Sequence, residues 1–323
     1  MVAKLQSIDF KRAGYNMLEY KQVFIIGAPR SGTTFLASLL DKTAYGKPVE
    51  THFITKYYKK LDSYGDISRF DNFRSLVGDI LKERPVQQWG LSLNVEDFYR
   101  SLPEGFDYKD VVNQILSLQK KDGNSAAWGD KTPHYIGDLD ILLTLFPHAS
   151  YIYIVRDGRD VALSLLEKNW GPNNIYECAR YWAKLNQKID LIHKMTEGGQ
   201  LYSLTYEGLL DKTKSHIFSI YDFLGEQVSE EDVNALSSSV KNKNYGKWKS
   251  KMSEGDVHTF EAVAGRDLTR LGYEVIYPDA KIPLYKKNIY FMHTKFRRAY
   301  FLFYINIIDG FRIRFLGKPP FNE

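Results

Sequence analysis

The sequence predicts an α/β fold with a central parallel sheet flanked by helices, because the order strand, loop, helix occurs twice. The first occurrence starts with the apolar run Val23–Ile26, passes through a glycine-bounded loop, and continues as TTFLASLLDK, whose apolar residues have helical spacing. The second starts with the aromatic and β-branched run Tyr151–Val155, makes a charged turn, and continues as the helical segment VALSLLEKNW. Strands that alternate with helices in this way are typical of a parallel sheet covered on both faces.

The remaining elements are expected on the same grounds. Helical spacing predicts helices over residues 176–194 and 213–224, and LYSLTYE predicts a strand over Leu201–Glu207. Residues 107–120 and 138–146 are expected to be helical or irregular. The chain has 323 residues, 44% of them hydrophobic, which is enough to bury a large core without disulfides or metals. The single cysteine excludes a disulfide framework, and no cluster of metal ligands stands out, so no metal is expected. Without a signal-peptide core or a long apolar stretch, we expect a cytoplasmic protein.

Charge is distributed unevenly along the chain. Residues 281–323 hold nine Lys or Arg against two acidic residues, and they are rich in aromatics. We therefore divide the chain into a domain over residues 1–280 and a basic aromatic extension over residues 281–323. The extension could lie on an anionic membrane surface as a peripheral contact, bind an anionic polysaccharide, or pack on the domain as a helix. The rest of the chain is slightly acidic, which disfavours nucleic acid as a partner.

The first loop has the pattern of a phosphate-binding loop without its lysine. GAPRSGTT, at Gly27–Thr34, fits G-x4-G-x-[ST], but Thr33 stands where ATP- and GTP-binding loops carry lysine. The glycines let backbone N–H groups converge on phosphate oxygens, and Thr33 and Thr34 add hydroxyl donors. Without the lysine, the loop favours a single 5′-phosphate over a triphosphate, and Arg30 faces the group beyond that phosphate. The alternative is an incidental glycine-rich turn.

A second anion-binding position is predicted at the end of the Tyr151–Val155 strand. Arg156 follows this strand directly, and Ser164 lies about two helical turns further on. Ligands of open α/β sheets bind beyond the carboxyl ends of strands, where an arginine can hold a phosphate with two hydrogen bonds. Alternatively, Arg156 could be a structural ion-pair partner of Asp157 or Asp160.

Taken together, APRSGTT and YIYIVRDGRDVALS resemble the two nucleotide-binding motifs of the sulfotransferases that use 3′-phosphoadenosine-5′-phosphosulfate (PAPS). The resemblance extends over about residues 20–278 and implies the P-loop NTPase-like sulfotransferase fold. It also implies an enzyme that moves a sulfuryl group from PAPS to an acceptor hydroxyl and releases adenosine 3′,5′-bisphosphate. The residues implied in binding the 5′-phosphosulfate are Arg30, Ser31, Gly32, Thr33 and Thr34, and those implied in binding the 3′-phosphate are Arg156 and Ser164.

Three shorter segments are similar to the carbohydrate and tyrosyl-protein branch of that family. VETHF resembles the stretch that carries a catalytic glutamate, here Glu50, and GDKTP resembles the (E/D)KTP segment of the same branch, here with Lys131. In LTYE, Tyr206 matches a tyrosine that can approach the nucleotide. The cytosolic phenol and steroid branch differs, since it carries lysine in the place of Arg30 and uses a histidine base.

Several catalytic roles follow as hypotheses. Glu50 is the first candidate for the base, best with a pKa raised by partial burial. His52 is its rival and would share a face with Glu50 if Val49–Phe53 is extended, or else would only orient the loop. Arg30 would stabilise charge on the bridging oxygen. Lys131 would neutralise sulfuryl oxygens or hold an anionic acceptor, unless it is a surface lysine in a turn.

The basic segment KNYGKWKSK, at Lys243–Lys251, could cover the nucleotide. Trp248 would then lie against a ring and Lys247 or Lys249 on the 3′-phosphate, with Lys168 as a weaker candidate; the alternative is a solvated basic loop. We expect the acceptor to be a carbohydrate or glycolipid, so that the reaction is carbohydrate sulfation. Two other functions remain open, namely a P-loop kinase and a non-catalytic nucleotide- or glycan-binding module.

Overall fold

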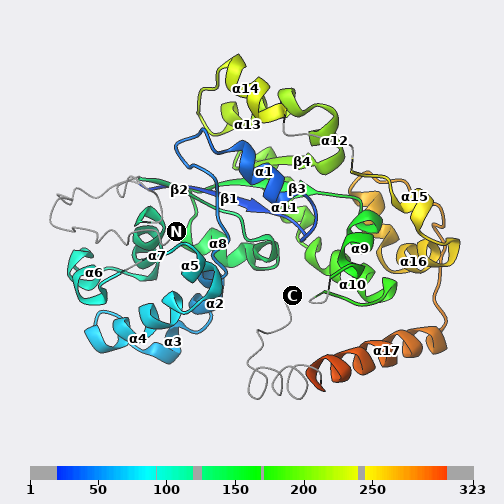
Figure 1. The fold of residues 1–323 in the computed structure, drawn as a ribbon, viewed down its shortest axis with the longest axis horizontal. Coiled ribbons are helices and arrows are strands. Elements are labelled where there is room, and N and C mark those ends of the chain that lie inside the picture. The colour runs from blue at the N-terminus through cyan, green and yellow to red at the C-terminus, as the bar shows by residue number, and fades with distance from the viewer. Residues whose placement is uncertain (1–19, 92, 119–125, 169–170, 239–243, 304–323) are drawn as a thin grey trace, which may run out of the picture. The chain divides into compact units, whose positions relative to one another are not determined.

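The computed structural model describes residues 20–91, 93–118, 126–168, 171–238 and 244–303 (Figure 1). The chain divides into two compact units. The first comprises residues 1–27, 32–154 and 188–241, and the second comprises residues 28–31, 155–187 and 242–323. The predicted boundary at residue 280 lies inside the second unit, so the division into a domain and an extension stays a prediction.

A four-stranded sheet forms the centre of the first unit. Its strands are β1 (Lys21–Ile26), β2 (Ala127–Asp130), β3 (Ser150–Val155) and β4 (Leu201–Thr205), in the spatial order β2-β1-β3-β4. β1 pairs in parallel with both β2 and β3, with Ile26 opposite Tyr153. The parallel α/β fold predicted from the sequence is thereby confirmed.

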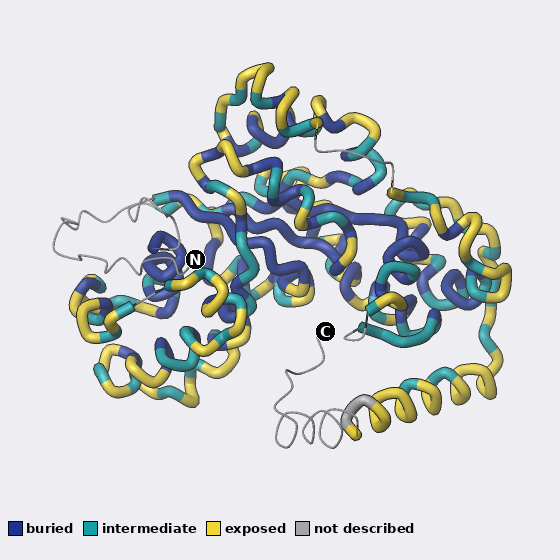
Figure 2. Tube along the Cα trace, viewed as in Figure 1, coloured by how far each residue is buried: buried dark blue, intermediate teal, exposed yellow. Residues whose placement is uncertain are grey.

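The core of this sheet is apolar and aromatic. Val23–Ile26 is fully buried (Figure 2), and the Phe24 ring stacks on Tyr151 with centroids 5.4 Å apart. The Trp128 ring meets Phe24 edge-on at 5.5 Å. A strand buried on both faces takes this continuous run of β-branched and aromatic residues, which is why the run is legible in the sequence.

Helices of the first unit pack around the sheet, with α1 on β1, α7 on β2, and α11 and α12 on β4. The helices of this unit are α1 (Thr33–Leu39), α2 (Phe53–Tyr58), α3 (Leu61–Tyr64), α4 (Phe70–Leu81), α5 (Arg84–Gln88), α6 (Val95–Ser101), α7 (Tyr108–Leu118), the 3-10 helix η2 (Pro133–Asp138), α8 (Leu139–Leu145), α11 (Ile189–Glu197), α12 (Tyr206–Asp211), α13 (Thr213–Phe223) and α14 (Glu230–Ser237).

The second unit is helical. Its helices are α9 (Gly158–Leu166), α10 (Ile175–Leu185), α15 (Trp248–Lys251), α16 (Glu254–Arg270) and α17 (Leu284–Phe303). α10 packs against α9 and α16, and the buried rings of Trp182 and Phe260 lie 6.0 Å apart between them. Both rings approach Gly158, where a Cβ atom would come within 2.6 Å of each. A glycine at the start of α9 therefore permits this close packing.

Two predicted elements differ from the observed ones: one helix is divided in two, and one strand ends early. The helix predicted over residues 176–194 is broken into α10 and α11, because Asn186 turns its side-chain amide back to the Trp182 carbonyl at 2.8 Å and competes with the helical pattern. The strand predicted over Leu201–Glu207 stops at Thr205. There the Thr205 hydroxyl accepts a hydrogen bond from the Gly208 amide and caps α12.

Candidate functional site

The loop between β1 and α1 depends on its two glycines. A Cβ atom on Gly27 would lie 2.3 Å from the Ile154 carbonyl oxygen. Gly32 has a left-handed backbone (φ +93°), and a Cβ atom there would lie 2.3 Å from the ring of Tyr206. Tyr206, predicted to approach the nucleotide, is buried and shapes this loop. Arg30 is a left-handed non-glycine residue (φ 71°), a conformation that is costly and is found preferentially at functional sites.

Ser31 supplies the direct test of whether this loop fits a phosphate. Its hydroxyl is buried and has no hydrogen-bond partner among the residues that the structure describes. A buried polar group without a partner costs free energy, and a phosphate oxygen would satisfy it. Two positions after Ser31, Thr33 is also buried, whereas Thr34 is exposed. The loop therefore fits an anionic phosphate group.

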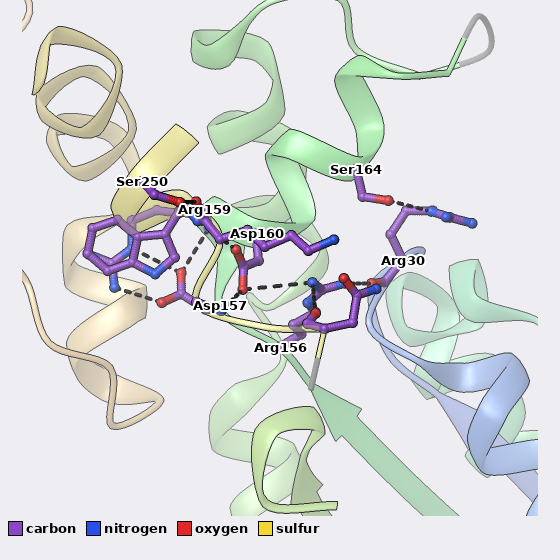
Figure 3. A network of polar contacts seen from close by, with 11 residues as sticks. Arg30, Arg156, Asp157, Arg159, Asp160, Ser164 and Ser250 are labelled. Atoms are coloured by element: carbon purple, nitrogen blue, oxygen red, sulfur yellow. Dashed lines mark hydrogen bonds and ion pairs between the residues drawn. The ribbon is translucent and has the colours of Figure 1, made fainter. Parts of the chain in front are cut away.

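In the second unit, Arg30, Arg156 and Ser164 come together and are called the arginine cluster (Figure 3). The buried guanidinium of Arg156 donates to the Arg30 carbonyl at 3.1 Å and to the Asn244 carbonyl at 2.6 Å. The side chain of Arg30 donates from Nε to the Ser164 hydroxyl at 2.9 Å. Ser164 was predicted to act beside Arg156, and the structure places it on the side chain of Arg30.

Asp160 connects this cluster to the segment that precedes α15. Its carboxylate accepts hydrogen bonds from the amides of Gly246 (2.5 Å) and Trp248 (2.9 Å), and one oxygen lies 3.7 Å from Arg156 Nη2. The structural ion pair between Arg156 and Asp160, which was the alternative to phosphate binding, is therefore present as a long contact. The carboxylate is buried and holds the 244–248 segment next to Arg156, so the two roles of Arg156 are compatible.

Trp248 has a different environment from the one predicted. The ring is 4% exposed, and its face lies 3.5 Å from Arg159 Cζ. Arg159 is itself buried in ion pairs with Asp157 (2.8 Å) and Glu261 (2.6 Å), so it holds the ring by a cation–π contact. Trp248 thus packs inside the second unit instead of presenting that face to a nucleotide.

The lysines of the same segment remain accessible. Lys247 and Lys249 are exposed, and Lys168 is half-buried. Lys243, at the start of the predicted basic segment, lies outside the described residues. Exposed ammonium groups next to a segment held by Arg156 and Asp160 can bind an anion that approaches the arginine cluster.

In the first unit, Glu50, His52, Lys131 and Thr34 come together and are called the glutamate cluster. One Glu50 oxygen lies 2.9 Å from His52 Nε2, and the other accepts a hydrogen bond from Lys131 Nζ. Lys131 also donates to the Thr34 hydroxyl at 3.3 Å. Since Lys131 is 7% exposed, the alternative of a surface lysine in a turn is wrong.

Backbone contacts at the end of β2 hold this cluster in place. The Lys131 amide donates to the Val49 carbonyl at 2.8 Å. The Thr132 hydroxyl accepts from the Thr51 amide at 3.0 Å and donates to Asp130 at 3.0 Å. The stretch around Glu50 is therefore tied to the strand end through main-chain groups, which fixes the position of the carboxylate.

The stretch Val49–Phe53 is not fully extended, although Glu50 and His52 do meet. His52 has a left-handed backbone (φ 56°) and Phe53 begins α2. The contact is consequently made by a turn at His52 and not by the alternation of an extended strand. The premise of an extended stretch was wrong, because the start of α2 takes over the backbone at this point.

The pKa of Glu50 is lowered to about 2, opposite to the raised value expected from burial. The hydrogen bond with His52 and the contact with Lys131 favour the ionised carboxylate by more than burial disfavours it. Burial dominates instead at Asp130, where it raises the pKa to about 6. Glu50 is thus fully ionised near neutral pH and is a weak proton acceptor on its own. Paired with His52, it can stabilise a protonated imidazole.

The comparisons with known proteins decide the family. The model of the "Sulfotransferase family" matches residues 22–230, about two thirds of the chain. The chain belongs to the sulfotransferase family. The resemblance to PAPS-dependent sulfotransferases drawn from the loop and from Arg156 is thereby confirmed.

Two proteins are related to this sulfotransferase in sequence. Protein-tyrosine sulfotransferase A of Caenorhabditis elegans is 26% identical over 305 residues, which cover 85% of this chain and 72% of that protein. An uncharacterized protein of Aquifex aeolicus (strain VF5) is 24% identical over 212 residues. That match covers 63% of this chain and 25% of the Aquifex protein, so the chain spans only a fraction of that protein's length.

Two solved structures show the same fold. The sulfotransferase domain from the curacin biosynthetic pathway has a TM-score of 0.52 at 18% identity and covers 79% of this chain and 99% of that domain. The sulfotransferase domain from the Synechococcus PCC 7002 olefin synthase has a TM-score of 0.53 at 18% identity, covering 83% and 99%. The predicted sulfotransferase fold is confirmed by this likeness.

Sequence reasoning missed three groups that the structure places at these clusters. They are the Asn244 carbonyl, the carboxylate of Asp160, and the hydroxyl of Thr132. A main-chain carbonyl has no signature in the sequence. Asp160 was named only as an ion-pair partner, although its place within RDGRD, just after a strand, could have marked it as a group of the site. In the described ranges, no group of three or more His, Cys, Asp or Glu side chains is placed to hold a metal ion.

Proposed function

We propose that this sulfotransferase moves a sulfuryl group from PAPS to an acceptor hydroxyl on a carbohydrate or glycolipid. The observation that carries the proposal is the arginine cluster together with the buried, unpartnered hydroxyl of Ser31. The Ser31 hydroxyl needs a hydrogen-bond partner, and the two guanidinium groups concentrate positive charge that attracts an anion. When bound, PAPS supplies a sulfuryl group attached to a phosphate, which is a good leaving group without a metal.

The chain's own residues would divide the work of binding. Ser31 donates its buried hydroxyl to a 5′-phosphate oxygen, and Thr33 and Thr34 add donors from the start of α1. Arg156 and Ser164 bind the 3′-phosphate, and Lys247 and Lys249 are exposed cations that follow Asn244, whose carbonyl contacts Arg156. Arg156 is preorganised for this task, because two carbonyl oxygens already fix its guanidinium plane.

Proton transfer would involve Glu50 and His52 as a pair. With Nε2 of His52 donating to Glu50, its Nδ1 carries the lone pair that can take the acceptor's proton. Glu50 then stabilises the resulting imidazolium, which suits its low pKa. Lys131 would balance the charge of sulfuryl oxygens, and Arg30 would stabilise the charge that develops on the bridging oxygen.

The acceptor is proposed from the aromatic segment at residues 56–107. Six of its aromatic residues are half-buried, and partly exposed rings suit stacking on a sugar; they are Tyr58, Tyr64, Phe70, Trp89, Tyr99 and Phe106. A peptide tyrosine is the second candidate, because the Caenorhabditis relative is by name a protein-tyrosine sulfotransferase. A cytoplasmic location stays part of the proposal.

The test begins with the donor site. Calorimetric titration should show micromolar binding of adenosine 3′,5′-bisphosphate, lost in Arg156→Ala and not matched by ATP with Mg²⁺. Preferential ATP binding would instead support a kinase, for which the chain lacks the loop lysine. Radiolabelled PAPS is then assayed with oligosaccharides, glycolipids and tyrosine peptides. Bisphosphate binding without transfer to any acceptor would support a non-catalytic module.

A further inference from the structure

The helix α17 carries a continuous apolar stripe on one face. Its members recur at separations of four, three, four, four and three residues, which places them on one side of an α-helix. Their exposed fractions lie between 49% and 71%, and Figure 2 shows the helix exposed along most of its length. The stripe, named here the outer stripe, consists of Tyr285, Ile289, Met292, Phe296, Tyr300 and Phe303.

A different side of α17 contacts α10 and the residue that caps it, within the second unit. The Asn174 side chain donates to the Tyr290 carbonyl at 3.3 Å and to the Thr294 hydroxyl at 2.9 Å. The Tyr176 ring stacks on Tyr290 with centroids 5.4 Å apart and an interplanar angle of 11°. At about 100° per residue, Tyr290 and Thr294 point well away from the outer stripe. The attachment to α10 therefore leaves most of the outer stripe on another side of α17; only Ile289, at the edge of the stripe, also lines a cavity with Asn174 and Met252.

The charge of α17 is entirely positive. Its 20 residues contain no Asp or Glu and five cations, which are Lys286, Lys287, Lys295, Arg297 and Arg298. On the helical wheel, Lys286 and Arg297 flank one side of the outer stripe and Lys295 flanks the other. Long basic side chains in this position can extend to a charged surface while the apolar face is buried.

We propose that the outer stripe of α17 docks on an anionic membrane surface, with the helix lying in the plane of the interface. The partner must offer both an apolar layer and negative charge, and an anionic lipid bilayer offers both. A second copy of the chain fits poorly, because pairing through the stripe would bring five cations against five with no acidic residue between them. Among the described helices, none combines the length and the apolarity needed to cross a bilayer. The proposal is independent of the donor and acceptor assignments.

Sedimentation of the 323-residue chain with lipid vesicles tests the proposal. The protein should bind vesicles that contain about 30% phosphatidylglycerol far better than pure phosphatidylcholine vesicles, and added salt should weaken the binding. Replacing Phe296 and Met292 by serine should lower the partition coefficient at least tenfold, because two apolar side chains would no longer be buried in the apolar layer. Replacing Lys295 and Arg297 by glutamine should lower it roughly thirtyfold, at about fivefold for each cation.

The matched control is Phe218→Ser. Phe218 is also an exposed aromatic (45%) but lies on α13 in the first unit, so this variant should bind vesicles as the unchanged protein does. Circular dichroism and bisphosphate titration check that every variant is folded. The proposal is overturned if the unchanged protein does not sediment with anionic vesicles, or if the Phe296 and Met292 variant binds them equally well. It is also overturned if light scattering shows a dimer that Phe296→Ser dissociates, which would assign the stripe to a second copy.

Discussion

Replacing Ser31 by alanine should have opposite effects on the free protein and on its nucleotide complex. The Ser31 hydroxyl is fully buried and has no hydrogen-bond partner among the described residues, so the folded protein bears its desolvation cost. Removing the hydroxyl should raise the free energy of unfolding of the ligand-free protein by about 1 kcal/mol. A hydrogen bond to an ionised phosphate contributes about 1.5–3 kcal/mol, so the affinity for adenosine 3′,5′-bisphosphate should fall roughly tenfold to a hundredfold.

Denaturant unfolding and calorimetry, each with and without the bisphosphate, measure both effects. Ser38→Ala is the matched control, because Ser38 lies on α1, the helix that follows the loop, and its hydroxyl already donates to the Phe35 carbonyl at 2.6 Å. The Ser38→Ala variant should leave the bisphosphate affinity unchanged, and it should not raise the free energy of unfolding as Ser31→Ala does. A destabilised Ser31→Ala protein would show that the hydroxyl has a partner. An unchanged affinity would show that it does not contact the phosphate.

Three further predictions test the two clusters. Gly32→Ala should lower the melting temperature and the bisphosphate affinity, because its Cβ would meet the Tyr206 ring; adding Tyr206→Ala should restore part of both in thermal-shift and titration assays. Arg156→Ala should weaken bisphosphate binding about a hundredfold and Arg156→Lys about tenfold, since an ammonium cannot bond both the Arg30 and Asn244 carbonyls in one plane; equal losses by calorimetry would contradict this reasoning. The pKa of Glu50, lowered from 4.5 to about 2, means that its contacts stabilise the fold above pH 4.5 and lose this effect as the pH falls toward 2, so Glu50→Gln should lower the free energy of unfolding more at pH 7 than at pH 3.

The sequence was most informative about the phosphate loop. A short apolar strand, two glycines and a following helix are local requirements, so Gly27, Gly32 and the start of α1 could be placed before the structure was known. Arg156 could be placed as well, because parallel strands bring their carboxyl ends to one edge of a sheet. The environment of Trp248 could not be predicted, since its cation–π partner is a buried arginine that lies 89 positions earlier in the chain.

The glutamate cluster shows where reasoning from sequence alone reaches its limit. VETHF and GDKTP each pointed to a residue, but the contact between Glu50 and Lys131 joins positions 81 residues apart. The direction of the Glu50 pKa followed from that contact and from a left-handed turn at His52, and neither is written in the local pattern.

By itself, the sequence determined the α/β order of elements, the loop that requires glycine, the arginine at the strand end and the positive charge of α17. Those features depend on hydrophobic periodicity, backbone conformation and composition, which are properties of neighbouring residues. Only the tertiary structure decided that Lys131 is buried, that Ser31 lacks a partner among the described residues, that Asn244 binds Arg156, and that the outer stripe of α17 stays exposed. Burial and hydrogen-bond partners depend on segments far apart in the chain, and these meet only when the chain folds.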